Sequence, residues 1–494
     1  MRARSLAALG ALLALASCTS PVEPPPPPVP TPSPTTTARE FTVSTSGPIG
    51  TADPALARAD TDALIGTNVY QRLMYVQSDT GELKPDAATD CYFSSETVYE
   101  CLLPAGLLFH NGDELTSSDV RFSIQRALRL DTAGTAVKLL DALIRISTPD
   151  ELTIRFYLSY ADNRFGYALA SLATSIVDEE TFDPDSGLPL EEMPVGSGPY
   201  QVTAIDADQV VFARYLEYVG PLAGVLDRIR LERLADSVAA ETAIADGTTD
   251  VVWRTLEPAA VDRLEAEIAA NPDGTTAQGF VRWPMDGSRV TRLAWSPDSR
   301  YRPNAALRAG IAQALQPDRT LASLVPVGVE GHLASFPVGG KPELPEIEGK
   351  RVTLKLAYSP SAPGHADLAS LLRSRIEELD RVSVRLVTSG DADLVLTDFP
   401  AWVPTTNGWL QLYLDDPLPG SADKLAELNQ RARTTTGDAR VVALGELQKQ
   451  AAADLTVLPV SQGDGIVMLG RGVTLAGLPF GSSGQLGLWG LRRG

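Results

Sequence analysis

The sequence predicts an α/β protein built as two lobes, and three observations point to this fold class. The chain has 494 residues, which is more than a single hydrophobic core usually organises. Its first half is rich in short β-like runs, whereas residues from about 288 to 465 alternate between strand-like and helix-like patterns. After about residue 465 the chain returns to short strands and glycine-rich turns, which favours a tail that goes back to the first lobe.

The N-terminal residues resemble a bacterial lipoprotein signal. Arg2 and Arg4 give a basic start, and residues 6–16 form an apolar run too short to span a membrane as a mature helix. The run ends in LASC, which resembles the lipobox, so we expect residues 1–17 to be a signal peptide. Cys18 would then carry acyl chains, palmitate among them, and hold the protein on the outer face of the plasma membrane in the cell envelope. The alternative is an ordinary secretory signal with a chance cysteine.

A proline-rich segment separates this anchor from the rest of the chain. Residues 21–37 read PVEPPPPPVPTPSPTTT, and proline both fixes φ and lacks an N–H donor. Residues 18–39 are therefore expected to form the lipidated cysteine and an extended polyproline linker.

Charge and cysteine content exclude some classes of partner. The formal net charge is −20, and an acidic surface repels nucleic acid, which we do not expect as a partner. Cys91 and Cys101 flank YFSSETVYE, a turn between strand-like runs, so a hairpin centred on Glu96 would bring them face to face. In an exported protein this favours a disulfide, and a pair of buried free thiols is the alternative.

The stretch LFHNGDELTSSDV, residues 108–120, holds a histidine and three acids, yet its pattern is structural. Asn-Gly is typical of a turn, and Thr116 with Asp119 forms a capping-box pattern for a helix that buries Val120, Ile124, Ala127 and Leu128. His110 is expected to hydrogen-bond within the turn.

The domain limits follow from these patterns. We expect lobe I to comprise residues 40–282 with 466–494 returning to it, and lobe II to comprise residues 283–465. In lobe II the expected elements are a helix at 304–315, a strand at 352–358, a helix at 367–379, strands at 382–387 and 392–398, and helices at about 421–433 and 438–454.

The same segments resemble a known family in a fixed order. LLFHNGDELTSSDVRFSIQRAL is similar to the "kFhdG-x-x-lTa-x-DV-x-fS" segment of family 5 of the bacterial extracellular solute-binding proteins, the peptide- and nickel-binding receptors of ABC importers. Further similar segments follow the family's order: TADP (51–54), NVYQRL (68–73), LKPDAA (83–88), GSGPY (196–200), RYLEYVG (214–220), DGTTDV (246–251) and residues 305–319.

The resemblance implies a type II, cluster C-like periplasmic-binding-protein fold, in which a hinge joins a β-rich lobe to an α/β lobe. Its implied function is to bind a small solute, most simply a short peptide, between the lobes and to present it to ABC permease subunits, as a monomer without a cofactor or catalytic residues. A non-peptide solute is one alternative. A lipoprotein of the same fold that acts as a scaffold or regulator in envelope assembly is another.

The resemblance also locates the acid that binds a peptide's ammonium group in this family. The segment DLVLTDFPAWVP, residues 393–404, places Phe399 at the family's aromatic position and Trp402 at its usual aspartate. Because Trp402 replaces that aspartate, another acid is needed to bind the ammonium group, and Asp398, or else Asp415 or Asp416, is the candidate. For each of these acids the alternative is an ordinary surface position. Trp402 can bind a cation on its ring face, stack on the ligand, or simply pack.

Aromatic residues complete the candidate ligand-binding set, with core packing as the alternative expected for about half of the tryptophans. Tyr70 is a candidate from its place in NVYQRL. The tryptophan candidates are Trp253, Trp283, Trp295, Trp402 and Trp409. No metal site is expected, because the three histidines stand apart in the sequence.

Overall fold

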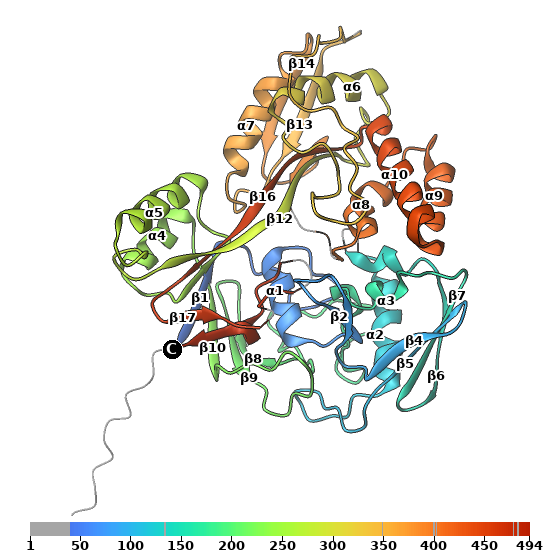
Figure 1. The fold of residues 1–494 in the computed structure, drawn as a ribbon, viewed down its shortest axis with the longest axis vertical. Helices are drawn as coiled ribbons and strands as arrows, with labels where there is room; N and C mark the ends of the chain where they lie inside the picture. The colour runs from blue at the N-terminus through green and yellow to red at the C-terminus, as the bar shows by residue number, and fades with distance from the viewer. Residues whose placement is uncertain are drawn as a thin grey trace, which may run out of the picture. The chain divides into compact units, whose positions relative to one another are not determined.

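A computed structural model describes residues 40–132, 135–347, 349–398, 401, 403–477, 479–481 and 484–494. Residues Glu40–Gly494 form one compact unit (Figure 1). The signal peptide, Cys18, the proline-rich linker and Trp402 lie outside the described residues, so their expected roles stay predictions.

The first lobe contains most of the short strands, as its sequence predicted. Its elements are β1 (Phe41–Thr45), α1 (Asp60–Val69), β2 (Met74–Val76), β3 (Leu83–Pro85), β4 (Asp90–Ser95), β5 (Val98–Leu102), α2 (Ser117–Leu130), β6 (Leu143–Asp150), β7 (Thr153–Leu158), α3 (Phe165–Ala168), β8 (Tyr200–Ile205), β9 (Gln209–Arg214), β10 (Arg228–Arg233), α4 (Ser237–Ala245), β11 (Val251–Trp253) and α5 (Pro258–Ala270).

Two long strands connect this lobe to the second one, and a short tail follows them. The remaining elements are β12 (Val281–Trp295), α6 (Ala305–Ala314), β13 (Val352–Ala357), α7 (His365–Ile376), β14 (Val382–Val387), β15 (Leu394–Thr397), α8 (Thr406–Leu414), α9 (Ala422–Thr434), α10 (Gly437–Asp454), β16 (Val457–Leu469), β17 (Val473–Leu475) and β18 (Leu491–Arg493).

One ten-stranded sheet runs through both lobes. Its order is β14-β13-β15-β12-β16-β11-β1-β10-β9-β8, so the antiparallel pair β12 and β16 lies between the strands of the two lobes (Figure 1). This pair keeps its ladder over most of its length but shifts register between Met285 and Arg289 and again between Thr291 and Arg292. The expected limits at 282/283 and 465/466 fall inside these two strands, and we propose that the lobes divide there. The two-lobed α/β fold is confirmed, with a sheet that is continuous rather than split.

The start of α2 folds as its sequence predicts. The amide of Ser118 donates to Thr116 Oγ1 at 3.2 Å, and the amide of Thr116 donates to Asp119 Oδ2 at 2.8 Å, which together form the capping box. Val120, Ile124 and Ala127 are buried, but Leu128 is 40% exposed. Leu128 lies at the edge of the apolar face, so the expectation that it is buried was wrong.

Buried apolar residues form separate clusters in the two lobes. One large cluster fills the second lobe between the sheet and α6, α7, α8, α9 and α10. The first lobe has two main clusters, one around β1, β8, β9 and β10 and another around α2 and the four-stranded sheet β4-β5-β7-β6. A smaller cluster lies beneath α4 and α5.

The end of the chain packs into the first lobe. Asn68, which is fully buried in α1, donates from Nδ2 to the carbonyl of Leu486 at 3.0 Å and accepts from the amide of Leu488 at 2.8 Å. Leu486, Leu488 and Leu491 belong to the first-lobe cluster. The tail therefore completes the hydrophobic core of the first lobe, to which β1 also contributes.

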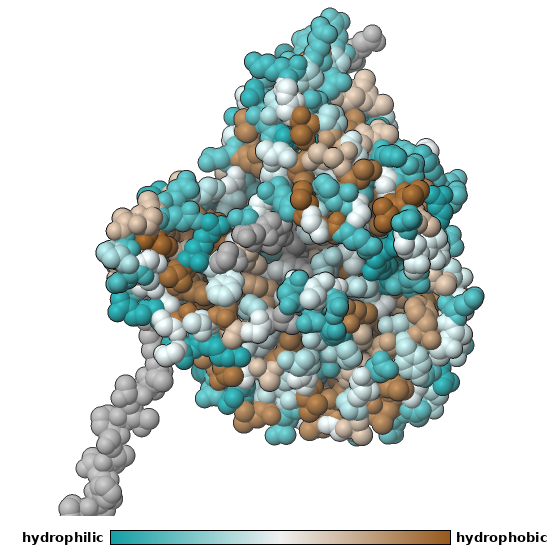
Figure 2. All heavy atoms as spheres, viewed as in Figure 1, coloured by the Kyte–Doolittle hydropathy of each residue, from teal (hydrophilic) through white to brown (hydrophobic). Residues whose placement is uncertain are grey.

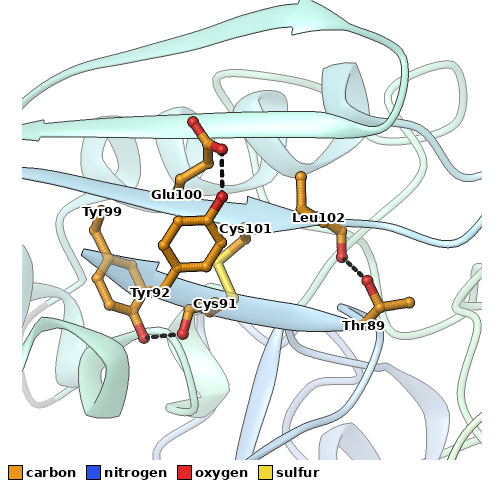
Figure 3. The surroundings of a disulfide bond; sticks show 7 residues. All are labelled: Thr89, Cys91, Tyr92, Tyr99, Glu100, Cys101 and Leu102. Atoms are coloured by element: carbon orange, nitrogen blue, oxygen red, sulfur yellow. Dashed lines mark hydrogen bonds between the residues drawn. A yellow bond between two sulfur atoms is a disulfide. The ribbon is translucent and has the colours of Figure 1, made fainter. Parts of the chain in front are cut away.

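The cysteine pair lies on the hairpin of β4 and β5. Cys91 is opposite Cys101 in the antiparallel register, and a disulfide joins them with their Cα atoms 4.1 Å apart (Figure 3). Beside the bond, Tyr92 donates its hydroxyl to Glu100 at 2.8 Å across the same pair of strands. The bond and the cross-strand contact fix the hairpin register.

Hydrophilic side chains cover much of the face that Figure 2 shows, with smaller hydrophobic patches between them. Within the described ranges, no helix combines the length and the apolar character needed to cross a membrane.

Candidate functional site

Two neighbouring cavities lie between the lobes. The smaller one, of about 210 Å³, is lined from the first lobe by Asp60, Trp253 and Arg254 and from the second by His365 and Asp398, among others. The larger one has a volume of about 540 Å³. Arg58 and Thr397 line both, so the two cavities border each other at the interface of the lobes.

A charged cluster spans the interface beside the smaller cavity. Arg254 Nη2 lies 2.8 Å from Asp398 Oδ2, and its other terminal nitrogen is paired with Asp60. Arg289 Nε lies 3.1 Å from the same Asp398 oxygen, and Arg289 Nη2 lies 3.3 Å from Asp60. His365 Nε2 is 3.6 Å from Asp398 Oδ1. Each aspartate thus faces two guanidinium groups, and the cluster joins α1, β12 and the ends of β11 and β15.

The positive groups decide the protonation state of Asp398. Burial acts to raise its pKa, but the charges of Arg289, Arg254 and His365 outweigh burial and lower the pKa to about 2. Burial and the neighbouring Arg289 lower the pKa of Arg254 to about 9. Burial also lowers the pKa of His365, against the charge of Asp398. At neutral pH Asp398 is therefore ionised, and Arg254 keeps its positive charge.

The backbone at Arg254 has an unusual conformation. Its φ is +51°, in the left-handed region that a non-glycine residue seldom adopts. The residue directly follows β11, and its amide donates to the carbonyl of Ile466 on β16 at 3.1 Å. The strained turn aims the guanidinium at both aspartates, as is common at functional sites.

The larger cavity is bordered mainly by residues of the second lobe. Its wall includes Arg292 and Trp295 from β12, Gln411 from α8, and Asp415 just after that helix. Thr135 and Arg58 come from the first lobe. A solute in this cavity would thus touch both lobes.

Two of the expected tryptophans line these cavities, and a third packs against a lining residue. Trp253 lines the smaller one and Trp295 the larger one. The ring of Trp409, on α8, lies beneath the guanidinium of Arg292, with 5.0 Å from Cζ to the ring centroid. In all three, the buried indole N–H has no hydrogen-bond partner among the described residues.

Two other aromatic candidates pack within the first lobe. Tyr70 is 1% exposed, donates its hydroxyl to the carbonyl of Ala52 at 2.9 Å, and contacts Phe182 edge-on. Trp283 is half-buried against the same core. Neither is among the lining residues of the two cavities.

The acids of the candidate set separate into two places. Asp398 lies in the charged cluster, whereas Asp415 and Asp416 line the larger cavity. Burial raises the pKa of Asp415 to about 6, and its Oδ1 accepts from Gln411 Nε2 at 2.6 Å. The structure does not bring the three acids together.

Sequence reasoning missed the arginines. Arg254, Arg289 and Arg292 are the central charged groups of the interface, and the last two lie on β12, the strand that joins the lobes. A signal was present, because arginines interrupt an otherwise apolar stretch at the expected lobe crossing, as in SRVTRLAW. Buried arginine is rare unless it is paired or functional.

His110 also lies elsewhere than expected. Its Nε2 is 3.0 Å from the carbonyl of Gly198 and its Nδ1 accepts from the amide of Gly196 at 3.3 Å, so it bonds to the GSGPY segment and not within its own turn. Burial lowers its pKa to about 4, which keeps the ring neutral. In the described parts of the chain, no group of three or more His, Cys, Asp or Glu side chains is arranged to hold a metal ion.

A second contact between the lobes lies at α9. Arg433 forms ion pairs with Asp162 and Asp141 of the first lobe, and the carbonyl of Arg433 accepts from the amide of Asn163 at 2.9 Å. Arg433 and Asp162 are both buried. Nearby, Arg164 of the first lobe lies 3.1 Å from Glu330 of the second. We call these residues the α9 contact.

Comparison with known proteins gives one family for this architecture. The profile described as bacterial extracellular solute-binding proteins, family 5 Middle, matches residues 82–330. The probable D,D-dipeptide-binding periplasmic protein DdpA of Escherichia coli is 23% identical over 392 residues, which cover 72% of each chain. The HTH-type transcriptional regulator SgrR of Pectobacterium atrosepticum is 26% identical over 190 residues, but these cover 38% of this chain and only 32% of that regulator.

Solved structures share the fold over nearly the whole chain. The periplasmic binding protein DppA from Helicobacter pylori, in complex with the peptide STSA, superposes with a TM-score of 0.77. The match covers 92% of this chain and 98% of that one at 16% sequence identity.

Proposed function

The chain belongs to family 5 of the bacterial extracellular solute-binding proteins, and from this we propose that it is the solute-binding component of an ABC importer, with short peptides as its ligands. It binds them between its lobes and presents the closed form to permease subunits. The observation that carries the proposal is the larger cavity, because its volume of about 540 Å³, bordered by residues of both lobes, falls within the range of small-molecule sites. The peptide ligands named for DdpA and DppA support the same ligand class.

Binding in this site stabilises the closed arrangement of the lobes. A ligand that touches Arg58 of the first lobe and Arg292 of the second makes all its contacts only when the lobes are together. Its free energy of binding therefore shifts the equilibrium towards the closed form, and by no more than its preference for that form. The protein acts as a receptor, and no step of this function requires a catalytic residue.

Native mass spectrometry of the full chain, purified in mild detergent without refolding, tests the proposal. We expect a heterogeneous set of co-purified short peptides. A single non-peptide solute would move the function to another ligand class, and a protein that stays empty in cell extract would favour the scaffold alternative.

A cavity-filling variant makes the test specific to the site. Val395 lines the larger cavity, so Val395→Trp should abolish co-purification of peptides. Val441→Trp is the control, because Val441 is exposed on α10 and does not line the cavity. Peptides retained by Val395→Trp would place the binding site elsewhere.

We further propose that Cys18 is lipidated and anchors the receptor to the outer face of the membrane, with residues 19–39 as its spacer. The lipobox-like LASC sequence supports this. Cys18→Ala should move the protein from the membrane fraction to the soluble fraction and abolish labelling with a palmitate analogue. Unchanged membrane association of the variant would contradict the anchor.

A further inference from the structure

An apolar loop is exposed on the first lobe, away from the two cavities. It connects β9 to β10, comprises residues 215–227 and reads YLEYVGPLAGVLD. Leu216 is 74% exposed, Val219 55% and Val225 46%. Single exposed apolar side chains are ordinary, but several of them in one short loop mark a surface that contacts another apolar surface.

Side chains of the lobe fix this loop in place. The hydroxyl of Tyr215 donates to the carbonyl of Phe109 at 2.9 Å. The hydroxyl of Tyr218 accepts from the amide of Leu222 at 3.2 Å, and Leu222 is buried. Gln71 Nε2 donates to a backbone carbonyl of the loop at 3.1 Å. The loop therefore turns some of its apolar side chains inward and presents the others to the outside in a defined arrangement.

The loop lies at the end of the sheet where the linker joins the first lobe. Strand β10 begins at Arg228, directly after the loop, and runs parallel to β1 with Phe41 opposite Ile229. The chain continues from Glu40 towards the proposed lipid anchor, and Glu40 pairs with both Arg228 and Arg230. The end of the lobe that the linker holds is thus the end that carries the exposed loop.

The C-terminal residues lie at the same end. Cζ of Arg493, on β18, is 4.9 Å from the ring centroid of Phe41, and the C-terminus lies beside β1 (Figure 1). Tyr200 contacts the loop at the backbone of Leu226 and donates its hydroxyl to the carbonyl of Leu488 in the tail at 3.4 Å. We call this part of the first lobe, formed by the start of β1, the loop and the tail, the linker end.

Positive groups gather at the linker end of an otherwise acidic protein. Glu40 is shared by the guanidinium groups of Arg228 and Arg230, which leaves one positive charge in excess. Arg492, on β18, donates to two backbone carbonyls rather than to a carboxylate. Arg471 is exposed just before β17, the strand that pairs with β18. Arginine binds phosphate oxygens well, and a basic surface next to an apolar loop suits a phospholipid headgroup layer.

We propose that the linker end docks on the phospholipid surface, with Leu216, Val219 and Val225 just below the headgroups and the arginines beside the lipid phosphates. This inference deepens the proposed anchoring. Acyl chains would hold the receptor near the membrane, and the loop determines which side of the first lobe faces it. A tether keeps the loop at high local concentration near the lipid, so a weak contact of three side chains is enough.

A fluorescent label in the loop tests the contact in the full chain. Leu216→Cys is labelled with the environment-sensitive dye NBD and reconstituted into vesicles of phosphatidylcholine and phosphatidylglycerol in equal parts. Brominated acyl chains quench a dye that enters the lipid, and we expect them to reduce its emission about twofold or more. Val441→Cys, labelled in the same way, is the control, because Val441 is exposed on α10 of the second lobe and should not be quenched.

Variants assign the contact to the apolar side chains. The label is placed on Ala223→Cys, an exposed position of the same loop. The loop variant combines Leu216→Ser, Val219→Ser and Val225→Ser, and the control variant combines Val238→Ser, Val327→Ser and Val442→Ser, which are exposed by 68%, 64% and 57% elsewhere. Only the loop variant should lose the quenching. Both should keep the melting temperature of the wild type, because all six side chains are exposed. Undiminished quenching in the loop variant would overturn the proposal.

The intact mass of the purified chain separates this inference from the proposed lipid anchor. If the chain is acylated and stays on the vesicles while the Leu216 label is not quenched, the anchor stands and the membrane contact of the loop is wrong. The apolar loop would then be left for a protein partner. If the chain lacks acyl chains and its Leu216 label is quenched, the anchor fails and the contact stands. If the chain lacks acyl chains and does not bind the vesicles, both are wrong.

Discussion

At the scale of single residues, the interface of the lobes contains two kinds of buried arginine. Arg254 and Arg289 share Asp60 and Asp398, so their desolvation is largely compensated by ion pairs. Arg292 is buried on the same strand as Arg289 without such compensation, and burial alone lowers its pKa to about 10. One strand thus carries a cation paired with carboxylates and a cation without an ion-pair partner among the described residues.

We predict that Arg292→Met stabilises the ligand-free protein. Methionine fills a similar volume and needs no hydrogen-bond partner, so the free energy of unfolding should rise by about 1–3 kcal/mol. Urea denaturation of ligand-free protein measures this change, and Arg300→Met should stay within about 0.5 kcal/mol of the wild type. A loss of stability in Arg292→Met would mean that the guanidinium has a structural partner.

Asp398 makes stability depend on acid pH. Its pKa in the folded protein, about 2, lies below the ordinary value of 3.8. It therefore contributes stability that is fully present above pH 3.8 and is lost as the pH falls through about 2. Asp398→Asn should lower the unfolding free energy at pH 7 by about 2 kcal/mol and remove this part of the acid dependence. Unfolding curves between pH 7 and pH 2 check both effects, and the exposed Asp391→Asn is the control. Parallel pH profiles for Asp398→Asn and the wild type would contradict the prediction.

At the scale of elements, α9 acts as a second bridge between lobes that β12 and β16 already connect. Its contact uses the buried ion pairs of Arg433 with Asp162 and Asp141 and the backbone bond from Asn163. The larger cavity, with Thr135 in its wall, adjoins this part of the first lobe. The α9 contact therefore stabilises the closed arrangement of the lobes independently of a ligand.

We predict that Arg433→Met shifts the protein towards an open form. The two aspartates gain water when the lobes separate, so the variant loses ion pairs that exist only in the closed form. Small-angle X-ray scattering of ligand-free protein should show a larger radius of gyration, and peptide affinity should fall about tenfold or more.

Arg431→Met provides the control for α9, since Arg431 is exposed on the same helix. It should leave both the scattering and the affinity unchanged. If Arg433→Met scatters like the wild type and keeps its affinity, the α9 contact does not contribute to closure.

Much of the fold could be predicted from local patterns, but the charged interface could not. The capping box at Thr116, the helix from Ala305 and the alternating pattern of β13 depend on neighbours within a few residues, and each element forms where its pattern indicates. The cluster around Asp398 depends on residues from α1, β11, β12 and α7, which only the tertiary fold brings together. Single-sequence patterns carry no distance information between such segments.

For the same reason, the sequence did not predict that one continuous sheet runs through both lobes. The tail was expected to return to the first lobe, but nothing local to β16 indicates that it pairs with both β11 and β12. Leu128 shows the corresponding error for helices, because it fits an apolar face by spacing and is 40% exposed.

At the scale of the whole molecule, both ends of the described chain meet in the first lobe. Strand β1 pairs with β10 and β11, and the tail residues Leu486 and Leu488 are held by Asn68. The first lobe is therefore completed by residues from the beginning, the middle and the end of the sequence.

We predict that Asn68→Leu destabilises the first lobe through the tail. The change leaves the amide of Leu488 and the carbonyl of Leu486 buried without their partner, which should cost about 2–4 kcal/mol of unfolding free energy. Hydrogen exchange should show the loss at β1 and β18 before it shows at β13. Gln430→Leu, on the exposed surface of α9, is the control, and equal protection of β1 in Asn68→Leu and wild type would refute the role of the tail.

The position of the tail has a consequence for the order of events during biosynthesis. The contacts of Asn68 span more than four hundred positions along the chain. The first lobe is therefore the first to be synthesised, but its core waits for residues at the end of the chain. Until Leu486 and Leu488 are released, the core around β1 lacks one of its walls, and folding that depends on such distant contacts is slow. The core of the first lobe is therefore expected to form only after the residues around Leu488 have been synthesised.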